Sequence, residues 1–533
     1  MDTKALRQKI LDLAIRGKLV PQDPNDEPAS VLLEKIREKK AQMVKDGKLK
    51  KKDIKNDSVI YVGEDNLHYE KFQDGTVKCI EDEIPFEVSE GWEWCRVRDV
   101  ASVKGGKRLP KGMSFSLYKT SHAYIRVTDM KNHTINTDDL KYISEDVFLK
   151  LKNYTISKDD LYVTIAGTIG VTGEVPAELD GMNLTENAAK VTNIQINKSF
   201  LCLLLQSEFV QQQFKGKTHQ VAMPKLALER ILSTLIPVCS TETQIAIVKR
   251  FWKIDQLIGL ISKEKDELTD TVSKTKSKIL DLAIRGQLVP QDPNDETASV
   301  LLEHIRAEKE KLIKQGKIKR DKKESIIFKC EDNSYYLQSG ELVESLSEWG
   351  FEELPDTWSI CCLGEICDYG NCINVDSANI DDSAWILDLE DIEKETGIVL
   401  KKIRKAKRNA ASTKHLFHKG QVLYSKLRPY LNKVVLADED GYCTSEILPL
   451  EFERNILPQY ARYYLMSPAF LRYANKCSYG VKMPRLGTTD GRKAIISIPP
   501  INEHERIVAT IEQVFTQLNS IVENLSWAKP PSE

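Results

Sequence analysis

The sequence predicts an α+β protein in which two α/β domains are separated by two long-helix (coiled-coil) regions, arranged as a circularly permuted pseudo-two-fold repeat. Three observations predict this fold class. Residues 9–50 recur as residues 278–319, a second apolar helical pattern also occurs twice, and the regions between them contain short β-rich runs broken by Gly and Asn. Together they indicate one duplicated frame that carries two different domains.

The first repeat is nearly identical in its two copies. Its offset is 269 residues (278 − 9), and between residues 9 and 34, 24 of 26 positions match their counterparts. The two exceptions are Lys18 and Pro28. Chance does not produce such identity, so this part of the frame arose by duplication.

The second repeat relates the centre of the chain to its C-terminal end. On an offset of 260 residues, six apolar positions at helical spacing have apolar counterparts: Ile247, Val248, Phe251, Ile254, Ile258 and Ile261 fall on Ile507, Val508, Ile511, Val514, Leu518 and Ile521. In the centre this pattern directly precedes residues 278–319, whereas in the outer unit the same two parts stand at opposite ends of the chain. We therefore expect two pseudo-equivalent halves and termini that meet.

The helices of the frame are expected in chain order. Apolar periodicity predicts a helix over residues 4–15, ended by Gly17, and a second helix over residues 29–46 with Asp26 as its N-cap. No proline occurs from residue 244 to 289, so one long helix is allowed there. Gly259 would weaken that helix by about 1 kcal/mol.

The globular domains are predicted from short β-rich runs, each set interrupted by one helix, over residues 199–215 and 458–475. The triplet Glu-Asp-Asn at 64–66 recurs at 331–333 and indicates a small β-hairpin in each half. The expected boundaries are 1–55 (N-terminal helical region), 56–83 (hairpin extension), 84–240 (first globular domain), 241–320 (central helical region), 321–353 (second hairpin extension), 354–500 (second globular domain) and 501–533 (C-terminal helix pairing with the N-terminal region).

Composition indicates a globular protein of the cytoplasm. Of 533 residues, 41% are hydrophobic and 29% are charged, and no apolar run approaches the ~20 residues of a membrane span. The eleven cysteines are scattered, and the cluster Cys361, Cys362, Cys367 and Cys372 lacks paired C-x-x-C spacing and nearby histidines. We interpret these cysteines as buried free thiols in a reducing compartment, without a metal. The net charge of −2 does not by itself indicate a nucleic-acid partner, although basic runs such as residues 401–408 occur.

The sequence lacks the motifs that would indicate catalysis. It contains no [NDS]PP[YFW] tetrapeptide for adenine methylation, no GxGxxG after a strand, no GxxxxGK[ST] and no HExxH. We therefore expect no catalytic residue, no metal and no cofactor on this chain. The helical frames are nearly identical while the globular domains share little residue identity, and this contrast is typical of one scaffold that reads two different targets.

Several of these segments resemble the specificity (S) subunit of type I restriction–modification enzymes. They are the LDLAIRGKLVPQDPNDEPASVLLEKI and LDLAIRGQLVPQDPNDETASVLLEHI repeats, the IPPINEHERIVATIE-type segment that closes each globular domain, GTIG at 167–170, and LYSKLRPYLNKV at 423–434. The resemblance covers nearly the whole chain, and its helical repeats are the most specific part.

The resemblance implies a non-catalytic subunit of a type I site-specific endonuclease and adenine DNA methyltransferase complex. Its two target recognition domains would each read half of a split sequence in double-stranded DNA. Two copies of a DNA methyltransferase (modification) subunit would dock on the helices, and restriction/motor subunits would complete the enzyme. S-adenosylmethionine is then expected on the modification partner, and ATP and Mg on the restriction partner. No membrane partner is expected.

Candidate DNA-binding residues are the polar and basic residues of loops in the two domains, because Arg and Lys contact guanine and phosphate. They are Lys104, Lys107, Arg108, Lys111, Arg126, Thr168, His219, Gln220 and Lys225 in the first domain, and Lys426, Arg428, Tyr430, Asn432, Lys433, Tyr479, Lys482 and Arg485 in the second. Strand-like alternation would place residues 426, 428, 430 and 432 on one face, although Pro429 favours a loop or a sheet edge. Taken singly, each candidate could be an ordinary surface residue.

Three alternatives remain at this point. The chain could be the specificity subunit of a related two-part modification or nuclease system. It could be an enzyme, either a fused modification–restriction polypeptide or a two-domain nuclease, although the missing motifs argue against this. It could also be a coiled-coil scaffold with two protein-binding domains.

Overall fold

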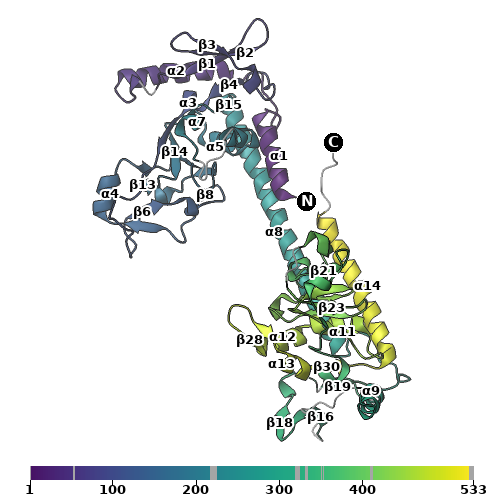
Figure 1. Ribbon diagram of the computed structural model, residues 1–533. Coiled ribbons are helices and arrows are strands. Elements are labelled where there is room, and N and C mark those ends of the chain that lie inside the picture. Colours follow the sequence, from purple (N-terminus) through teal and green to yellow (C-terminus); the bar gives the residue numbers. More distant parts are fainter. Residues whose placement is uncertain are drawn as a thin grey trace. The chain divides into compact units, whose positions relative to one another are not determined.

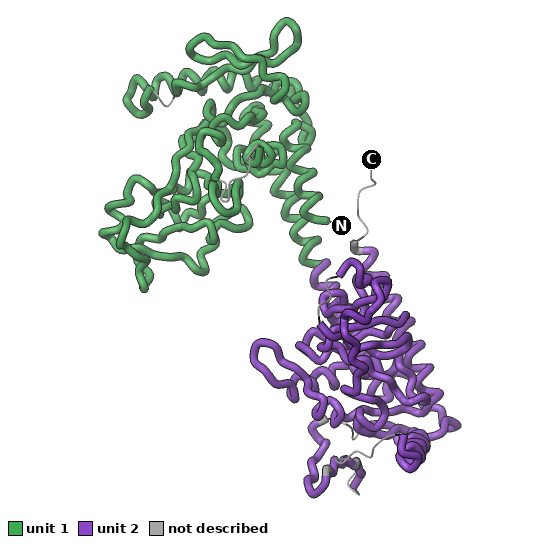
Figure 2. Tube along the Cα trace, viewed as in Figure 1, with its two compact units in different colours: residues 1–264, 528–533 green, residues 265–527 purple. Residues whose placement is uncertain are grey.

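The computed structural model describes residues 2–51, 54–216, 225–317, 325–330, 334–349, 351, 353–408 and 412–526. The chain divides into two compact units, residues 1–264 with 528–533, and residues 265–527 (Figure 2). None of the described helices is long and apolar enough to cross a membrane.

The first unit begins with two helices, α1 (Thr3–Ile15) and α2 (Ala29–Lys45) (Figure 1). The carboxylate of Asp2 accepts the backbone N–H groups of Lys4 and Ala5 and so caps α1. Gly17 follows α1 with a φ of +70°, the left-handed conformation that the sequence predicts. The prediction that Asp26 caps α2 is wrong: Pro28 occupies the N-cap position, and the Asp26 carboxylate accepts the hydroxyl groups of Ser240 and Thr243.

The predicted hairpin extension of the first unit is a three-stranded antiparallel sheet in the order β1-β2-β3. Its strands are β1 (Ser58–Val62), β2 (His68–Phe72) and β3 (Val77–Cys79). Tyr61 and Tyr69 stand opposite each other across β1 and β2 and stack with ring centroids 5.9 Å apart.

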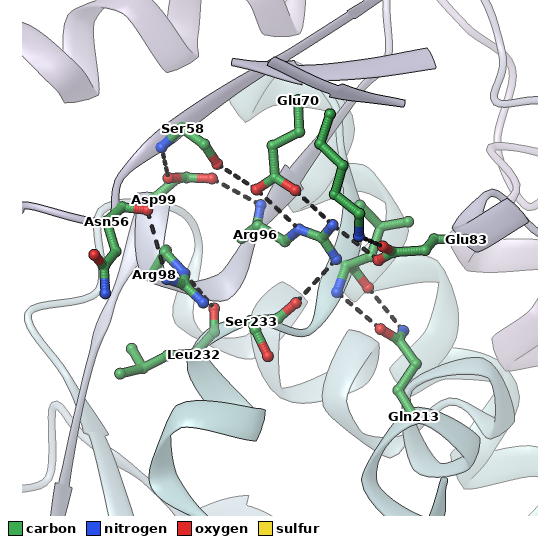
Figure 3. A network of polar contacts seen from close by, with 12 residues as sticks. Asn56, Ser58, Glu70, Glu83, Arg96, Arg98, Asp99, Gln213, Leu232 and Ser233 are labelled. Carbon is green, nitrogen blue, oxygen red and sulfur yellow. Dashed lines mark hydrogen bonds and ion pairs between the residues drawn. The ribbon is translucent and has the colours of Figure 1, made fainter. Parts of the chain in front are cut away.

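A buried polar network attaches this sheet to the globular domain (Figure 3). The guanidinium of Arg96 donates to Glu70 through Nη2 (2.7 Å to Oε2) and Nε (3.2 Å to Oε1), and Nη2 also lies 2.9 Å from Oε2 of Glu83. The hydroxyl of Ser58 donates to Glu70 at 2.7 Å, and the Asp99 carboxylate accepts the backbone N–H groups of Ser58 and Arg96. The hairpin is therefore held to its domain by charge-assisted hydrogen bonds.

The globular domain of the first unit contains two four-stranded sheets, a two-stranded sheet that starts and closes the domain, and a short strand pair, β7 (Met130–Lys131) with β8 (Thr134–Ile135). The first sheet has the order β12-β11-β14-β5, with β5 (Ser102–Gly105), β11 (Leu161–Thr164), β12 (Thr172–Glu174) and β14 (Ala188–Thr192). The second has the order β10-β13-β6-β9, with β6 (His122–Ile125), β9 (Lys141–Ile143), β10 (Thr155–Ile156) and β13 (Met182–Leu184). The closing pair is β4 (Glu93–Arg96) with β15 (Leu235–Val238).

The helix predicted over residues 199–215 is two helices, α5 (Lys198–Gln206) and α6 (Glu208–Lys215). Ser207 separates them, and its hydroxyl accepts the backbone N–H of Val210 as the N-cap of α6. From Phe200 to Gln206 every residue of α5 is buried, so this helix forms the centre of the domain's core. The corresponding helix predicted over 458–475 is likewise divided, into α11 (Pro458–Met466) and α12 (Pro468–Lys476), with Ser467 as the cap.

The central helix α8 (Thr241–Ile284) is continuous over 44 residues, as the absence of proline allows, and the boundary between the units falls within it. Its first part packs on α1 in the first unit. There the guanidinium Nε of Arg7 lies 2.7 Å from the carboxylate of Asp255, and Phe251 is buried with Leu11 and Leu203.

The second unit contains the same parts in permuted order: the end of α8, α9 (Ala298–Lys314), a hairpin extension, a globular domain and α14 (Ile501–Ser526). The extension is the sheet β16-β17-β18, with β16 (Ser325–Lys329), β17 (Tyr335–Ser339) and β18 (Leu342–Ser345). Lys276 of α8 donates to Asn519 of α14 at 2.5 Å, and Ile507 and Ile511 of α14 are fully buried. The predicted pseudo-equivalent halves are thus confirmed.

The second globular domain has a five-stranded sheet, a three-stranded sheet and two strand pairs. The five-stranded order is β20-β23-β26-β21-β22, with β20 (Asn374–Val375), β21 (Trp385–Leu387), β22 (Ile403–Arg404), β23 (Lys414–Phe417) and β26 (Gly441–Thr444). The three-stranded order is β25-β24-β27, with β24 (Val422–Ser425), β25 (Val434–Leu436) and β27 (Ile447–Leu450). The pairs are β19 (Ser359–Cys362) with β30 (Ile495–Ile498), and β28 (Ser478–Tyr479) with β29 (Arg485–Leu486).

The two halves differ where the hairpin meets the domain. Strand register places Leu337 of β17 where β2 has Glu70, and Cys362 of β19 where β4 has Arg96. Leu337 and Cys362 belong to an apolar cluster with Ile495. One half therefore buries an ion pair at this junction and the other half buries apolar side chains. The expectation that the termini meet involves residues 527–533, which lie outside the described residues.

Candidate nucleic-acid interface

Three loops of the first domain converge on the turn 185–187 between β13 and β14. The backbone N–H of Lys107 donates to the carbonyl of Leu184 at 2.9 Å, and that of Ala166 donates to Asn187 at 3.2 Å. The ammonium of Lys225 donates to the carbonyl of Glu186 at 3.4 Å. We call residues 105–111, 165–171, 185–187 and 225–226 the first loop cluster.

Gly106 allows the closest of these approaches. A Cβ at this position would lie 2.1 Å from the carbonyl oxygen of Thr185 and 2.4 Å from that of Leu184, both of them backbone atoms that cannot move independently. Only glycine lets the loop cross the turn at this distance. The Tyr124 hydroxyl then donates to the carbonyl of Lys107 at 2.7 Å, and burial raises the pKa of Tyr124 to about 12, so this donor stays protonated at neutral pH.

The structure brings together five of the residues that the sequence analysis singles out, and all of them are exposed: Lys107, Arg108, Lys111, Thr168 and Lys225. Lys104 is also exposed, on β5, opposite Lys190 of β14. Arg126 is engaged differently, because its Nη2 donates to the Asp129 carboxylate at 2.6 Å and to the carbonyl of Asp139 at 2.7 Å. His219 and Gln220 lie outside the described residues.

In the second domain, two loops converge on the equivalent turn between β26 and β27. The backbone N–H of Lys426 donates to the carbonyl of Glu446 at 3.0 Å, and that of Arg428 donates to Pro484 at 2.7 Å. The guanidinium of Arg485 forms an ion pair with the Glu446 carboxylate, with Nη2 2.7 Å from Oε1. We call residues 426–433, 445–446 and 478–486 the second loop cluster.

The loop 426–433 is a tight turn, not an alternating strand. Arg428 (φ +50°) and Asn432 (φ +46°) both have left-handed backbone and flank a short 3₁₀ turn that begins at Pro429. The predicted loop is confirmed, but the strand-like alternation of residues 426–432 is wrong, because the two left-handed residues reverse the chain.

Some side chains of this loop anchor it to the rest of the domain, and others face solvent. The Asn432 amide donates to the carbonyl of Met466 at 2.9 Å, and the Lys433 ammonium donates to that of Leu389 at 2.6 Å. Burial lowers the pKa of Lys433, although its ordinary range lies far above neutral pH. Tyr430 is exposed, as are Tyr479 and Lys482 of the neighbouring hairpin. Tyr479 stands directly opposite Arg485 in the β28–β29 pairing.

The two loop clusters occupy equivalent points of their domains. An isolated β-bridge joins Ala166 to Lys225 in the first domain, and another joins Leu427 to Arg485 in the second. On an offset of 260 residues Lys225 corresponds to Arg485, and Glu186 corresponds to Glu446. Neither glutamate is predicted from the sequence, because the residue types expected to contact DNA are basic and aromatic. The shared offset is the signal that could have found them.

Two kinds of side-chain group in the described residues bear on metal or thiol chemistry: clusters that could bind a metal ion, and cysteine thiols with a shifted pKa. Within the described part of the chain, no three His, Cys, Asp or Glu side chains are grouped so that they could hold a metal ion. Cys361, Cys362 and Cys367 are buried, and burial raises the pKa of each thiol. The interpretation of the cysteines as buried thiols is therefore only partly right, because Cys79 is exposed and Cys330, Cys372 and Cys477 are only partly buried.

The structure thus defines a class of protein in which a duplicated helical frame carries two related domains, with loop clusters that are equivalent in position and different in side chains. The chain belongs to the family described as "Type I restriction modification DNA specificity domain", whose model matches residues 89–270 and 355–526. The resemblance to type I specificity subunits is thereby confirmed.

Two curated relatives come from Escherichia coli. The chain is 29% identical over 425 residues to the type I restriction enzyme EcoAI specificity subunit, a match that covers 69% of this chain and 63% of that relative. It is 28% identical over 411 residues to the EcoEI specificity subunit, covering 68% of this chain and 61% of the relative. The match thus spans less than two thirds of either relative.

One solved structure supports the fold. It was reported as "Structural basis underlying complex assembly and conformational transition of the type I R-M system", and its chain aligns with a TM-score of 0.50 and 15% identity. The alignment covers 83% of this chain and 94% of that chain.

Proposed function

We propose that this chain is a non-catalytic subunit that recognises a bipartite sequence in double-stranded DNA, one half through each loop cluster. The observation that carries the proposal is the equivalence of the two clusters in position combined with their difference in side chains. The first carries exposed lysines, one exposed arginine and an exposed threonine, whereas the second carries the partly buried Arg428 and Arg485 beside the exposed Tyr430 and Tyr479. Such differences give different base preferences, because Arg fits guanine bidentately and Lys favours phosphate as a point charge.

The helices are proposed to dock the partner subunits. Ile261 on α8 and Ile521 on α14 occupy equivalent positions, and each is 42% exposed. Equivalent exposed apolar positions in both halves are consistent with two copies of one partner, a DNA methyltransferase (modification) subunit that carries S-adenosylmethionine. Restriction/motor subunits with ATP and Mg would join the same assembly in the cytoplasm. The pairing of residues 501–533 with the N-terminal region is part of this proposal.

Domain exchange tests the proposal. Residues 84–240 are replaced by the matching domain of a relative, the chain is co-expressed with its modification partner, and the methylated sequence of the host DNA is determined. One half of the methylated sequence should change while the other half and the spacer stay the same. The matched exchange of residues 354–500 should change the opposite half.

Two outcomes would contradict modular recognition. Either exchange could alter both halves, or the parent chain could yield a methylated sequence that is not split in two.

A further inference from the structure

The guanidinium of Arg485 is held by Glu446 in a defined orientation. Nε of Arg485 lies 3.1 Å from both carboxylate oxygens, and Nη2 lies 2.7 Å from Oε1. The carboxylate therefore grips the side edge of the guanidinium, the edge formed by Nε and one N–H of Nη2. Such two-point pairing fixes the plane of the group as well as its position.

The outer edge of the Arg485 guanidinium, formed by one N–H of Nη1 and one N–H of Nη2, does not contact Glu446. Of the five N–H groups of arginine, two take part in the pair. The other three are the two N–H groups of Nη1 and the second N–H of Nη2. The outer edge, with one N–H from each Nη, has the spacing that matches O6 and N7 of guanine. An arginine gripped on its side edge is thus pre-organised to use its outer edge for a base.

The Arg485–Glu446 pair is more open to solvent than the ion pair that joins the first hairpin to its domain. The side chains of Arg485 and Glu446 are 35% and 23% exposed, against 7% and 5% for Arg96 and Glu70, and ion pairs that are open to solvent add less to stability. The hydrogen bonds from Arg485 lower the pKa of Glu446, so it remains a carboxylate at neutral pH. Arg485 also lies on the β28–β29 hairpin and bridges to Leu427, within the second loop cluster.

The equivalent pair in the first domain is arranged differently. Lys225 donates to the backbone carbonyl of Glu186, and the Glu186 carboxylate accepts a hydrogen bond from the Thr185 hydroxyl (3.2 Å), with the Tyr124 hydroxyl oxygen 3.4 Å away. A lysine has no planar fork for a carboxylate to orient. The same position therefore carries an oriented arginine in one domain and a point charge in the other.

We propose that Glu446 is a positioning residue that fixes the guanidinium of Arg485, so that Arg485 reads a guanine in the half-site of the second domain. This inference rests on the proposed function, because it needs the second loop cluster to face DNA. Arg485 supplies the base contact, and Glu446 supplies the orientation.

A double-mutant cycle tests the inference by selecting bound sequences from a pool of fully randomised DNA duplexes. The full-length parent, Glu446→Gln, Arg485→Ala and the double variant are compared, each assembled with the modification partner. The half-site read by the second domain is identified by exchanging residues 354–500. Glu451→Gln is the matched control, since Glu451 is an exposed carboxylate of the same domain that accepts a hydrogen bond from neutral Gln421.

The two single variants should weaken the preference for one and the same guanine by about 5- to 150-fold. The double variant should lose no more than Arg485→Ala alone, because Glu446 acts through Arg485. The melting temperature of Glu446→Gln should stay within about 3 °C of the parent. Glu451→Gln should leave the selected sequence unchanged.

Arg485→Lys supplies an independent measurement that does not depend on the folding of Glu446→Gln. It keeps the charge but removes the fork, so the guanine preference should fall while the salt dependence of binding stays at the parent slope.

The inference is overturned if Glu446→Gln keeps the parent's preference, if the double variant affects a further base, or if Arg485→Lys still selects that guanine. The parent chain could select a split sequence in which no guanine preference is lost in Arg485→Ala. That result would overturn this inference and leave the proposed function intact. A parent that selects no split sequence would overturn the proposed function itself.

Discussion

Glu70→Leu should destabilise the first unit by removing one partner of a buried ion pair. The side chains of Glu70 and Arg96 are only 5% and 7% exposed. The substitution takes two hydrogen bonds from the Arg96 guanidinium and removes the acceptor of the Ser58 hydroxyl. Arg96 would keep the Glu83 carboxylate at 2.9 Å and the carbonyl of Ser233 at 3.0 Å.

The expected magnitude follows from this residual pairing. Breaking a buried ion pair costs ~3–5 kcal/mol, and the retained contact with Glu83 places the expected loss at the lower end, about 3 kcal/mol. The second half supplies the control, because strand register places Leu337 and Cys362 at the same two positions. Glu70→Leu combined with Arg96→Cys recreates this apolar pair and should recover more than half of the loss.

Native-state hydrogen exchange on the full chain measures the effect in each unit separately. The amides of β2 and β4 should exchange about 100-fold faster in Glu70→Leu, while those of β17 and β19 keep the parent rates and serve as an internal reference. A loss below about 1 kcal/mol in the single variant would refute this reasoning. A double variant as unstable as the single one would refute it equally.

Three further predictions concern the first unit and the second loop cluster. Gly106→Ala should weaken recognition of the first half-site and cost about 1–3 kcal/mol of stability, because its Cβ would lie 2.1 Å from a backbone carbonyl oxygen. Gly105→Ala is the control, because the nearest atom to its Cβ would be 3.6 Å away. This control should change DNA binding and the free energy of unfolding only slightly. Burial raises the pKa of Asp99 to about 6, above the ordinary 3.8, so the folded state holds this proton more tightly than the unfolded state. The unfolding free energy of the first unit should therefore fall as the pH rises from about 4 to about 6, and Asp99→Asn should abolish that part of the pH dependence in denaturant titrations. Arg428→Ala should reduce selectivity in the second half-site by about 5- to 150-fold, whereas Lys482→Ala should weaken binding to all duplexes alike; a folded Arg428→Ala variant that binds as tightly and as selectively as the parent would contradict the role of this loop.

The repeats explain why most of the fold could be predicted from the sequence. A duplicated frame shows each helical pattern twice in the sequence, and α8 is continuous, as the absence of proline allows. The missed features depend on contacts that spacing does not reveal. Asp26 has the residue type of an N-cap, but its carboxylate is satisfied by Ser240 and Thr243, more than 200 positions away in the sequence. The boundary between α11 and α12 at Ser467 is marked in the sequence by the proline that follows it. The boundary between α5 and α6 at Ser207 is marked only by the serine.

The candidate site was predictable in composition but not in geometry. Lys426 and Arg485 are candidates from separate segments of the sequence, and only the fold shows that both contact Glu446. Single-residue patterns also do not distinguish exposed cations from anchored ones, because Lys433 and Arg126 look like their neighbours in the sequence yet bond within the protein. The acidic residues of both clusters are not predicted from the sequence, because the residue types expected to contact DNA are basic and aromatic.

Methylome sequencing of a host that carries this chain with its modification partner shows whether the two domains recognise a sequence in two halves. The expected result is a methylated sequence made of two specified halves and an unspecified spacer of constant length, because each domain is proposed to read one half. A methylated sequence that is contiguous, or two halves separated by a variable spacer, would contradict this proposal.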